Sequence, residues 1–434
     1  MLPCHSMGQS AIERVISTRV FDTSFKFSQD EIRVLRDLAK KVAECAARPE
    51  MAHKAKLWTD HNALRKTRPL LFCDPENGWN EILPQSVMQT RDPAARYWEM
   101  RLRREIFWAD VMGDDYVVEP WFDVPWDYHD SKWGIAQKLI GGENGGAYRW
   151  DPPIKDFEAD FPKLVFPTID IDRERSRRFL DLANELFGDI LQVRRKTVWW
   201  WGVGLSAQFS DLRGLDAFMI DLYDNPEWIH RTMAFLRDGM LAKMSYLEDQ
   251  GLLSSHQGNT YVGSGGLGWS DELPPEGHDP DRIKLMDIWG NAESQETVSV
   301  SPAMFEEFVF QYQLPLMERF GLNCYGCCES LEDRMHIVKR IPRLRRVSVC
   351  PWADVRKMAD EIRTDYIYSW KPNPAQLAVP AADIDASRRM LRDMLGAAEG
   401  CRIEIVMKDN HSIGNNVDNV VKWCRMVMEE VSGL

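Results

Sequence analysis

Two adjacent thiols and a carboxylate follow a short apolar segment in residues 325–329, which read YGCCE. The helix-like run 302–320 precedes them, so a strand is expected to end here and a helix to begin. Two later apolar segments end in polar groups as well: residues 366–370 run into Lys371, and residues 403–407 run into Lys408. In a parallel barrel, polar side chains at the carboxyl ends of successive strands meet in one mouth. The pattern predicts an active site there.

The residue types at these strand ends are those that bind zinc. Zinc takes cysteine, histidine and carboxylate ligands tetrahedrally, and a catalytic site keeps one position open. We expect Cys328, His411 and Glu296 as ligands, with Cys327 as an alternative or additional thiolate. No H-E-x-x-H helix is present. The alternative is that the two cysteines are a buried plug and that His411 is a surface loop residue.

Four further residues at these ends are candidates for catalysis. Lys371 and Lys408 hold an anion or protonate a leaving group. Asp409 orients Lys408 or a ligand imidazole, and Glu329 assists protonation or caps the following helix. Residues expected to contact the substrate come from the remaining strand ends: Trp201, His256, Gln295 and Tyr325.

The order of elements predicts the fold that would gather these groups. Eight strand-length apolar segments are expected at 117–122, 197–203, 252–256, 294–298, 322–327, 346–350, 366–370 and 402–407. Helix-period segments lie between most of them, at 226–250, 302–320, 331–339, 355–362, 381–395 and 416–431. This alternation is typical of an α/β protein with a (β/α)₈ TIM barrel. An open doubly wound sheet is the competing fold, although no G-x-G-x-x-G fingerprint opens its first unit.

The region before the first expected strand is different in character. Residues 1–115 are mainly helical in pattern, and Ser28 with Glu31 forms a capping-box signature. We expect this N-terminal extension to cover one side of the barrel, which spans residues 116–434, or to build a homodimer contact. The glycine-rich residues 263–268 lack the Lys-Ser/Thr of a phosphate loop, and we expect a mobile loop at the barrel mouth.

Composition excludes several classes of function. The chain has 434 residues, 44% of them hydrophobic, and a net charge of −13, which argues against nucleic-acid binding. No apolar run is long enough to span a membrane, and the first ten residues do not have the pattern of a secretory signal. Nine irregularly spaced cysteines do not form a disulfide framework. They predict free thiols in a reducing cytoplasm.

Three segments resemble the uroporphyrinogen decarboxylase superfamily, in its branch of cobalamin-dependent methyltransferases. They are residues 300–308 (VSPAMFEEF), 325–331 (YGCCESL) and 369–375 (SWKPNPA), and the resemblance covers about the last two thirds of the chain. In that branch the turn is similar to a zinc-binding His-x-Cys pair, with another cysteine near the last strand. Here Cys328 matches the cysteine, Gly326 stands at the histidine, and His411 stands near the distant cysteine. The arginine-rich N-terminal segment of true uroporphyrinogen decarboxylases is absent.

The resemblance implies a zinc-assisted methyltransferase. The methyl group of a small methylated substrate would move to the corrinoid of a separate protein, or from it to a thiol. The supply of aromatic residues favours an aromatic methyl ether, and hence O-demethylation. Two alternatives stay open: a metal-free decarboxylase or lyase whose lysines hold carboxylates, and a non-catalytic barrel that binds a ligand or a corrinoid partner.

Overall fold

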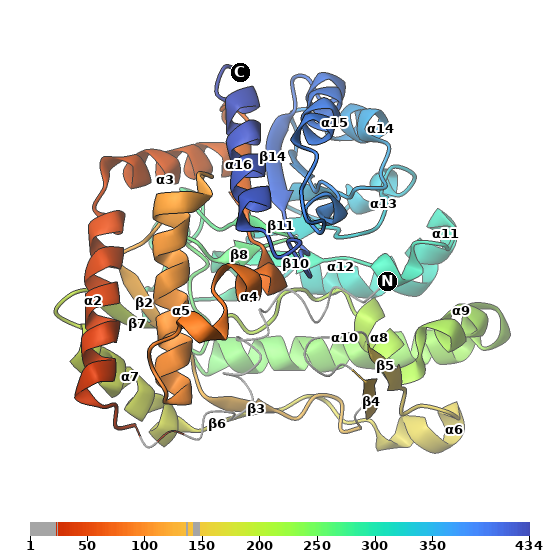
Figure 1. Cartoon of the computed structure of the whole chain (residues 1–434). Coiled ribbons are helices and arrows are strands. Elements are labelled where there is room, and N and C mark those ends of the chain that lie inside the picture. The colour runs from red at the N-terminus through yellow and green to blue at the C-terminus, as the bar shows by residue number, and fades with distance from the viewer. Residues whose placement is uncertain (1–22, 24, 136–137, 142–147) are drawn as a thin grey trace.

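Six parallel strands form the central sheet of the protein (Figure 1). The computed structural model describes residue 23 and residues 25–135, 138–141 and 148–434. The order of the strands across the sheet is β1 (Leu70–Cys73), β14 (Arg402–Met407), β13 (Ile367–Trp370), β12 (Leu344–Val349), β11 (Leu322–Tyr325) and β10 (Trp289–Ala292). The first strand therefore pairs with the last, and the others follow in reverse chain order.

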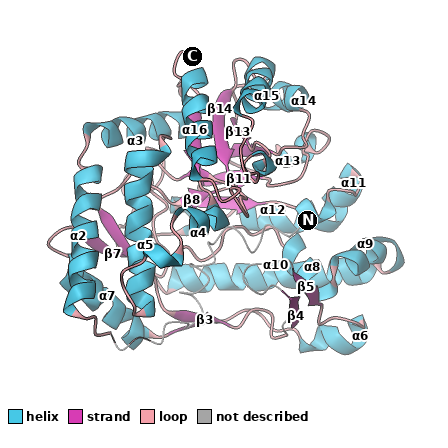
Figure 2. Cartoon of the chain, viewed as in Figure 1, coloured by secondary structure: helices cyan, strands magenta, loops and turns pink. Residues whose placement is uncertain are grey.

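The outer face of this sheet is covered by helices (Figure 2). Helix α16 (Val417–Val431) contacts β1, α14 (Val355–Ile362) contacts β12 and β13, and α12 (Gln311–Met317) contacts β10. A parallel strand needs a crossover to reach its neighbour, and here most crossovers are helical. The mixed α/β class that the sequence predicted is confirmed.

A second parallel pair, β2 (Trp121–Val124) and β7 (Gln192–Arg195), lies apart from the six-stranded sheet. Backbone hydrogen bonds connect its flanking residues to both edges of that sheet. The amide of Asp115 donates to the carbonyl of Leu71 at 2.9 Å, and the amide of Val203 donates to that of Asn291 at 2.8 Å. Among the described residues these seams are not continuous ladders, so a closed barrel is not confirmed.

Two short antiparallel pairs lie outside these strands, and a third forms a hairpin. They are β3 (Tyr128–Asp130) with β6 (Ile169–Ile171), β4 (Lys138–Gly141) with β5 (Tyr148–Asp151), and the hairpin β8 (Tyr261–Val262) with β9 (Gly266–Leu267). The remaining helices of four or more residues include α4 (Trp79–Ile82), α6 (Phe157–Asp160), α8 (Ser206–Arg213), α9 (Leu215–Asp224), α10 (Pro226–Asp249), α11 (Pro302–Phe305), α13 (Met335–Val338) and α15 (Ile384–Ala397).

The N-terminal helices pack against the side of the molecule that carries β2 and β7. Helix α2 (Gln29–Ala46) contacts α5 (Pro93–Phe107) and α7 (Arg173–Phe187), and α7 covers β2 and β7. The predicted capping box is confirmed, because the Ser28 hydroxyl accepts from the Glu31 amide while the Glu31 carboxylate accepts from the Ser28 amide. Helix α3 (Pro49–Asn62) follows, and β1 then comes from within the first 115 residues.

Several predicted strands are wrong. Residues 252–256 are not a strand, and at 294–298 the chain forms a 3₁₀ turn, Gln295–Thr297, just after β10. Residues 197–203 follow β7 as an extended segment without assigned strand structure. The segments 252–256 and 197–203 contain buried apolar residues, and apolarity alone does not distinguish a buried loop from a strand. Residues 294–298 are mostly polar, and the strand β10 ends just before them. None of the helices in the described part of the chain combines the length and hydropathy that crossing a bilayer requires.

The glycine-rich segment 263–268 is part of the interior and not a loop over a mouth. All of its residues are buried, and the hairpin lies against the inner face of the sheet. A Cβ atom on Gly266 would come within 2.3 Å of the Arg346 guanidinium carbon, and one on Gly265 within 2.3 Å of Val406. The glycines are required because the hairpin backbone touches the sheet directly.

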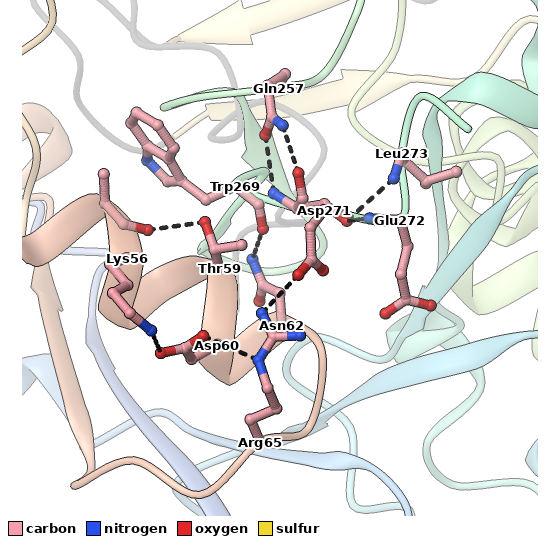
Figure 3. Close-up of polar contacts among 12 residues, drawn as sticks. Lys56, Thr59, Asp60, Asn62, Arg65, Gln257, Trp269, Asp271, Glu272 and Leu273 are labelled. Atoms are coloured by element: carbon pink, nitrogen blue, oxygen red, sulfur yellow. Dashed lines mark hydrogen bonds and ion pairs between the residues drawn. The ribbon is translucent and has the colours of Figure 1, made fainter. Parts of the chain in front are cut away.

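The inner face of the sheet carries a buried ion pair between β12 and β14. The Arg346 guanidinium donates to both carboxylate oxygens of Glu404, at 2.7 and 3.1 Å, and to the Asn62 side-chain oxygen at 2.6 Å. Burial alone would raise the pKa of Glu404, but the charge of Arg346 holds it far below its usual range. The Asn62 amide in turn donates to the carbonyl of Leu267 at 2.8 Å. It also donates to the carbonyl of Trp269 at 2.6 Å (Figure 3).

We expect Glu404→Gln to destabilise the protein by about 3–5 kcal/mol, because it leaves the Arg346 charge buried without its counter-ion. The measurement is the free energy of unfolding from denaturant titration. Asp418→Asn is the matched control, since the Asp418–Lys422 pair is exposed at both side chains and such pairs contribute about 0–1 kcal/mol. Equal effects of the two substitutions would contradict the role assigned to the buried pair.

Candidate functional site

A cavity of about 340 Å³ lies at the carboxyl ends of β1, β2 and β7. Asp74 and Glu76 follow β1, Pro125 follows β2, and Lys196 follows β7, and all four side chains line it. In α/β proteins, ligands bind at the carboxyl ends of parallel strands. The position and size of this cavity make it the candidate site for a small molecule.

Aromatic rings form much of the cavity wall. The aromatic residues that line it are Phe72, Tyr97, Trp108, Tyr116, Trp121, Trp126, Tyr128, Trp201 and Tyr261. The Trp108 and Tyr116 rings stack with centroids 4.1 Å apart, and Phe72 stacks on Tyr116 at 5.9 Å. Such a stack fixes the shape of the wall, because each ring is held on its face by the next.

Two half-buried carboxyl groups of the cavity form no ion pair within 4.0 Å with a residue that the structure describes. The Tyr116 hydroxyl donates to Glu105 at 2.9 Å, and burial raises the pKa of Glu105 to about 7. Glu119 accepts from the Trp121 indole at 2.8 Å and from the Asn259 amide at 2.9 Å, and burial raises its pKa too. Because its pKa is near neutrality, Glu105 can both donate and accept a proton.

The third acidic group, Glu76, is placed next to the predicted lysine of the last strand. The Lys408 ammonium lies 3.9 Å from the Glu76 carboxylate and 2.8 Å from that of Asp409. Burial raises the pKa of Glu76 well above its ordinary value, although the charge of Lys408 opposes this. The structure thus brings Lys408 and Asp409 together at the edge of the cavity, as part of an acid–base cluster with Glu76.

The cationic side chains of the cavity have internal partners. Lys196 lies 3.9 Å from the Asp123 carboxylate and 3.3 Å from the Gln257 carbonyl. Burial lowers the pKa of Lys196. Burial alone would raise the pKa of Asp123, but the charges of nearby cations, above all Lys196, lower it. Arg194 forms a further ion pair with Asp123 from the neighbouring strand.

Lys371 lies in the interior rather than at an exposed mouth. Its ammonium donates to the Ser369 hydroxyl at 2.6 Å and to the Ser369 carbonyl at 3.0 Å. Burial lowers the pKa of Lys371 to about 8, with Glu404 opposing the shift and Lys408 adding to it. The predicted lysine therefore interacts with the buried polar network of the sheet.

The predicted cysteine turn is buried beside the hairpin. The sulfurs of Cys327 and Cys328 lie 3.6 Å apart, and the Ser264 hydroxyl donates to Cys327 at 3.3 Å. Glu329 accepts from the backbone amides of Cys327 and Ser294, both at 2.9 Å, and burial raises its pKa to about 7. Glu329 thus fixes the turn to the end of β10.

The predicted zinc ligands do not form a set. The His411 ring nitrogen Nδ1 lies 3.3 Å from the Asn77 amide, at an exposed position. The Glu296 carboxylate accepts from the buried Ser206 hydroxyl at 2.8 Å. No group of three or more His, Cys, Asp or Glu side chains with metal-binding geometry occurs among the residues described.

Of the residues predicted to contact substrate, Trp201 lines the cavity and the other three do not. The Tyr325 hydroxyl donates to Gln313 on α12 at 2.8 Å, on the helix side of the sheet. Cys324, its neighbour on β11, contacts Arg346 on the inner side. Because neighbouring side chains on a strand face opposite ways, Tyr325 faces the helices and not the predicted substrate site. His256 is buried, which lowers its pKa to about 3, and Gln295 lies in the 3₁₀ turn.

Some cavity residues that we did not predict have a recognisable signal in the sequence. The apolar residues 70–73 lie between Pro69 and Asp74-Pro75, and short apolar runs bounded by such residues are typical of buried strands. Reading them as β1 would have identified Asp74 and Glu76. Glu105 has no such signal, because it lies in a helix rich in charged residues.

Comparisons with known proteins do not identify the chain. No protein-family model matches it, and no curated protein matches it. Among solved structures it is similar to a methyltransferase from Methanosarcina mazei, at 12% identity and a TM-score of 0.48, over 87% of this chain and 98% of that one. A likeness this distant does not say which residues react, so the function has to be inferred from the site.

The raised pKa of Glu105 predicts a pH dependence of stability. Between its unfolded pKa of about 4.5 and its folded pKa of about 7 the native state binds more protons, so stability falls as pH rises, by at most about 1.4 kcal/mol per pH unit. In Glu105→Gln this contribution is absent. We expect the melting temperature of the wild type to fall relative to that of the variant between pH 5 and 7.5. Parallel curves, like those expected for exposed Glu185→Gln, would contradict the assignment.

The position of His411 predicts that it is dispensable for any metal that the thiols hold. We expect His411→Ala to leave metal content and melting temperature unchanged, because its ring is exposed and contacts the Asn77 side chain. Metal analysis of protein purified under reducing, anaerobic conditions gives the measurement, with Cys327→Ala/Cys328→Ala for comparison. Loss of near-stoichiometric zinc on removal of His411 would show that the imidazole is a ligand after all.

Proposed function

We propose that this protein is a methyltransferase that holds a small methylated substrate in the cavity beside β1, β2 and β7. The observation that carries the proposal is an aromatic-walled cavity containing Glu105, a carboxyl group whose pKa lies near 7. A small substrate fits its volume of about 340 Å³. The resemblance of residues 325–331 and 369–375 to methyltransferases supports the reaction class.

We propose also that the strands form a closed barrel. The eight strands of the barrel would be β1, residues 115–124, residues 192–203, and β10 to β14 in chain order. The hydrogen bonds from Asp115 to Leu71 and from Val203 to Asn291 support closure at both seams. On this proposal the barrel begins at β1, and α2, α3 and α5 form its helical cover.

The cavity residues have distinct roles in this proposal. The stacked rings of Phe72, Trp108 and Tyr116 exclude water. Glu105 holds a proton on its carboxyl group and accepts from Tyr116, so it can supply a proton to a departing heteroatom that requires one. Lys408, Asp409 and Glu76 would set the charge at the edge of the site.

The resemblance implies a corrinoid protein as methyl acceptor and zinc as a Lewis acid. Because the predicted ligands do not form a set, we assign substrate binding to the cavity and no step to the thiols. A metal-free decarboxylase is the second candidate. It is favoured by buried Lys196, which could hold a carboxylate, and by Glu105, which could protonate the resulting carbanion.

The proposal predicts methyl transfer that depends on the cavity. The assay offers methoxybenzoates, methylated ammonium compounds and methyl thioethers with cobalamin reduced to the Co(I) state, and measures the demethylated product by mass spectrometry. We expect Trp126→Leu to lower kcat/KM at least about tenfold, because the ring lines the cavity. Exposed Trp352→Leu is the matched control.

Two outcomes would overturn this proposal. Demethylation no faster than without protein, across all three classes, would exclude methyl transfer from these donors. Release of CO₂ from the benzoates without loss of their methyl groups would favour the decarboxylase.

A further inference from the structure

We infer that the cavity binds an organic cation, a methylated ammonium group enclosed by aromatic rings and facing the carboxylates of Glu105 and Glu119. This inference rests on the proposed function and names its substrate class. It replaces the methyl ether that the sequence favoured with a donor whose methylated nitrogen carries a positive charge.

The first observation is that two half-buried carboxyl groups have no cation at ion-pair distance. Arg101 acts on Glu105, and Lys196 and Arg194 act on Glu119, only through their charge from farther away. Glu105 accepts from a phenol, and Glu119 accepts from an indole and a backbone amide, so all three donors are neutral. Neither carboxylate forms an ion pair within 4.0 Å with any residue that the structure describes. A carboxyl group without a cation in contact either keeps its proton or pairs with a cation from outside, and a ligand in the cavity could supply that cation.

The second observation is that the cavity's own cations are already compensated. Lys196 lies beside Asp123. The Arg101 guanidinium donates to the Asp123 carbonyl at 2.7 Å and covers the Phe122 ring at 4.6 Å. An anionic ligand would compete with these internal contacts, whereas a cationic ligand would find two carboxyl groups without a cation at contact distance. The charge of the site therefore selects a cation.

The third observation concerns the walls. Rings that line the cavity already bind guanidinium groups of the protein: Arg194 lies 4.8 Å from the Trp121 centroid and Arg195 lies 4.6 Å from that of Trp126. A guanidinium covers one face of a ring, and both rings also contribute surface to the cavity. Ring faces attract cations through their quadrupole, and aromatic cages are the usual site for quaternary ammonium groups.

The same walls discriminate between kinds of ammonium. A primary ammonium directs its three N–H donors to acceptors, and the carboxylates that it would reach already accept from Tyr116, Trp121 and Asn259. A fully methylated nitrogen has no donor to satisfy, and its methyl groups bury apolar area against the rings. The two carboxylates then act through their charge, while their hydrogen bonds to neutral donors stay in place.

Binding of a cation is linked to proton release. The charged groups around Glu105 are Arg101 on its own helix and Glu119 and Asp123 on the facing segment. A ligand cation between the carboxylates favours their ionised forms. Near pH 7, where Glu105 is partly protonated, binding should expel a fraction of a proton to the buffer.

The experiment compares choline with its neutral isostere 3,3-dimethylbutan-1-ol by isothermal titration calorimetry. We expect choline to bind the full-length protein at least about tenfold more tightly, and to release protons when measured in buffers of different ionisation enthalpy. Glu105→Gln/Glu119→Gln should lower choline affinity at least about tenfold and abolish the release, leaving the affinity for the neutral alcohol unchanged. Circular dichroism checks the fold of the variant.

Equal affinity for the two isosteres, or tighter binding of 4-methoxybenzoate than of choline, would overturn the inference without using any variant. Its failure is distinguishable from failure of the proposed function. If ethers are demethylated and choline does not bind, methyl transfer stands and the cation inference falls. If choline binds tightly and no methylated ammonium compound is demethylated, the cavity is a cation site and methyl transfer from that class falls.

Discussion

The ion pair between Arg346 and Glu404 is the constraint on which the interior depends. Placing a guanidinium and a carboxylate on the inner face of a parallel sheet requires that every remaining donor and acceptor be satisfied there. Asn62 accepts from Arg346, Ser369 donates to Glu404, and the β8–β9 hairpin holds Asn62 through the Leu267 carbonyl. The hairpin in turn divides the interior, because Tyr261 and Leu267 form part of the cavity wall while Gly266 touches Arg346. The cavity exists on one side of the hairpin because the polar network fills the other.

The sequence predicts the elements whose bounds depend on nearby residues, such as helix caps and short apolar strands between helices. Helix α14 begins and ends where its apolar spacing indicates, at Val355 and Ile362, and the Ser28 cap starts α2. The strands β11, β13 and β14 were also placed, because each is a short apolar run between recognisable helix ends. The edge of the sheet was not placed, since the four residues of β1 lie among helices and have no distinguishing period of their own.

The candidate site was harder to predict for a physical reason. Its chemistry comes from the absence of a partner, and a sequence does not show which carboxylates will lack a cation. Glu105 belongs to a helix surrounded by arginines, yet its hydrogen-bond partner is a tyrosine eleven residues away. The cysteine turn, by contrast, is conspicuous in the sequence because two thiols are adjacent. The two thiols are easy to see in the sequence and lie next to the polar interior. The raised pKa of Glu105 comes mainly from burial, which the sequence does not show.

The thiols and the cavity are nevertheless connected by one short segment. Ser264 in the hairpin turn donates to Cys327, and Tyr261, three residues earlier, lines the cavity. Gly263 and Gly265, on either side of Ser264, have positive φ angles. A Cβ atom on Gly263 would come within 3 Å of Cys324, and one on Gly265 within 3 Å of Val406. The turn therefore has no room to shift without displacing the sheet. A rigid hairpin keeps the aromatic wall in place, and it does so while touching the thiols, so the two halves of the interior share one structural support.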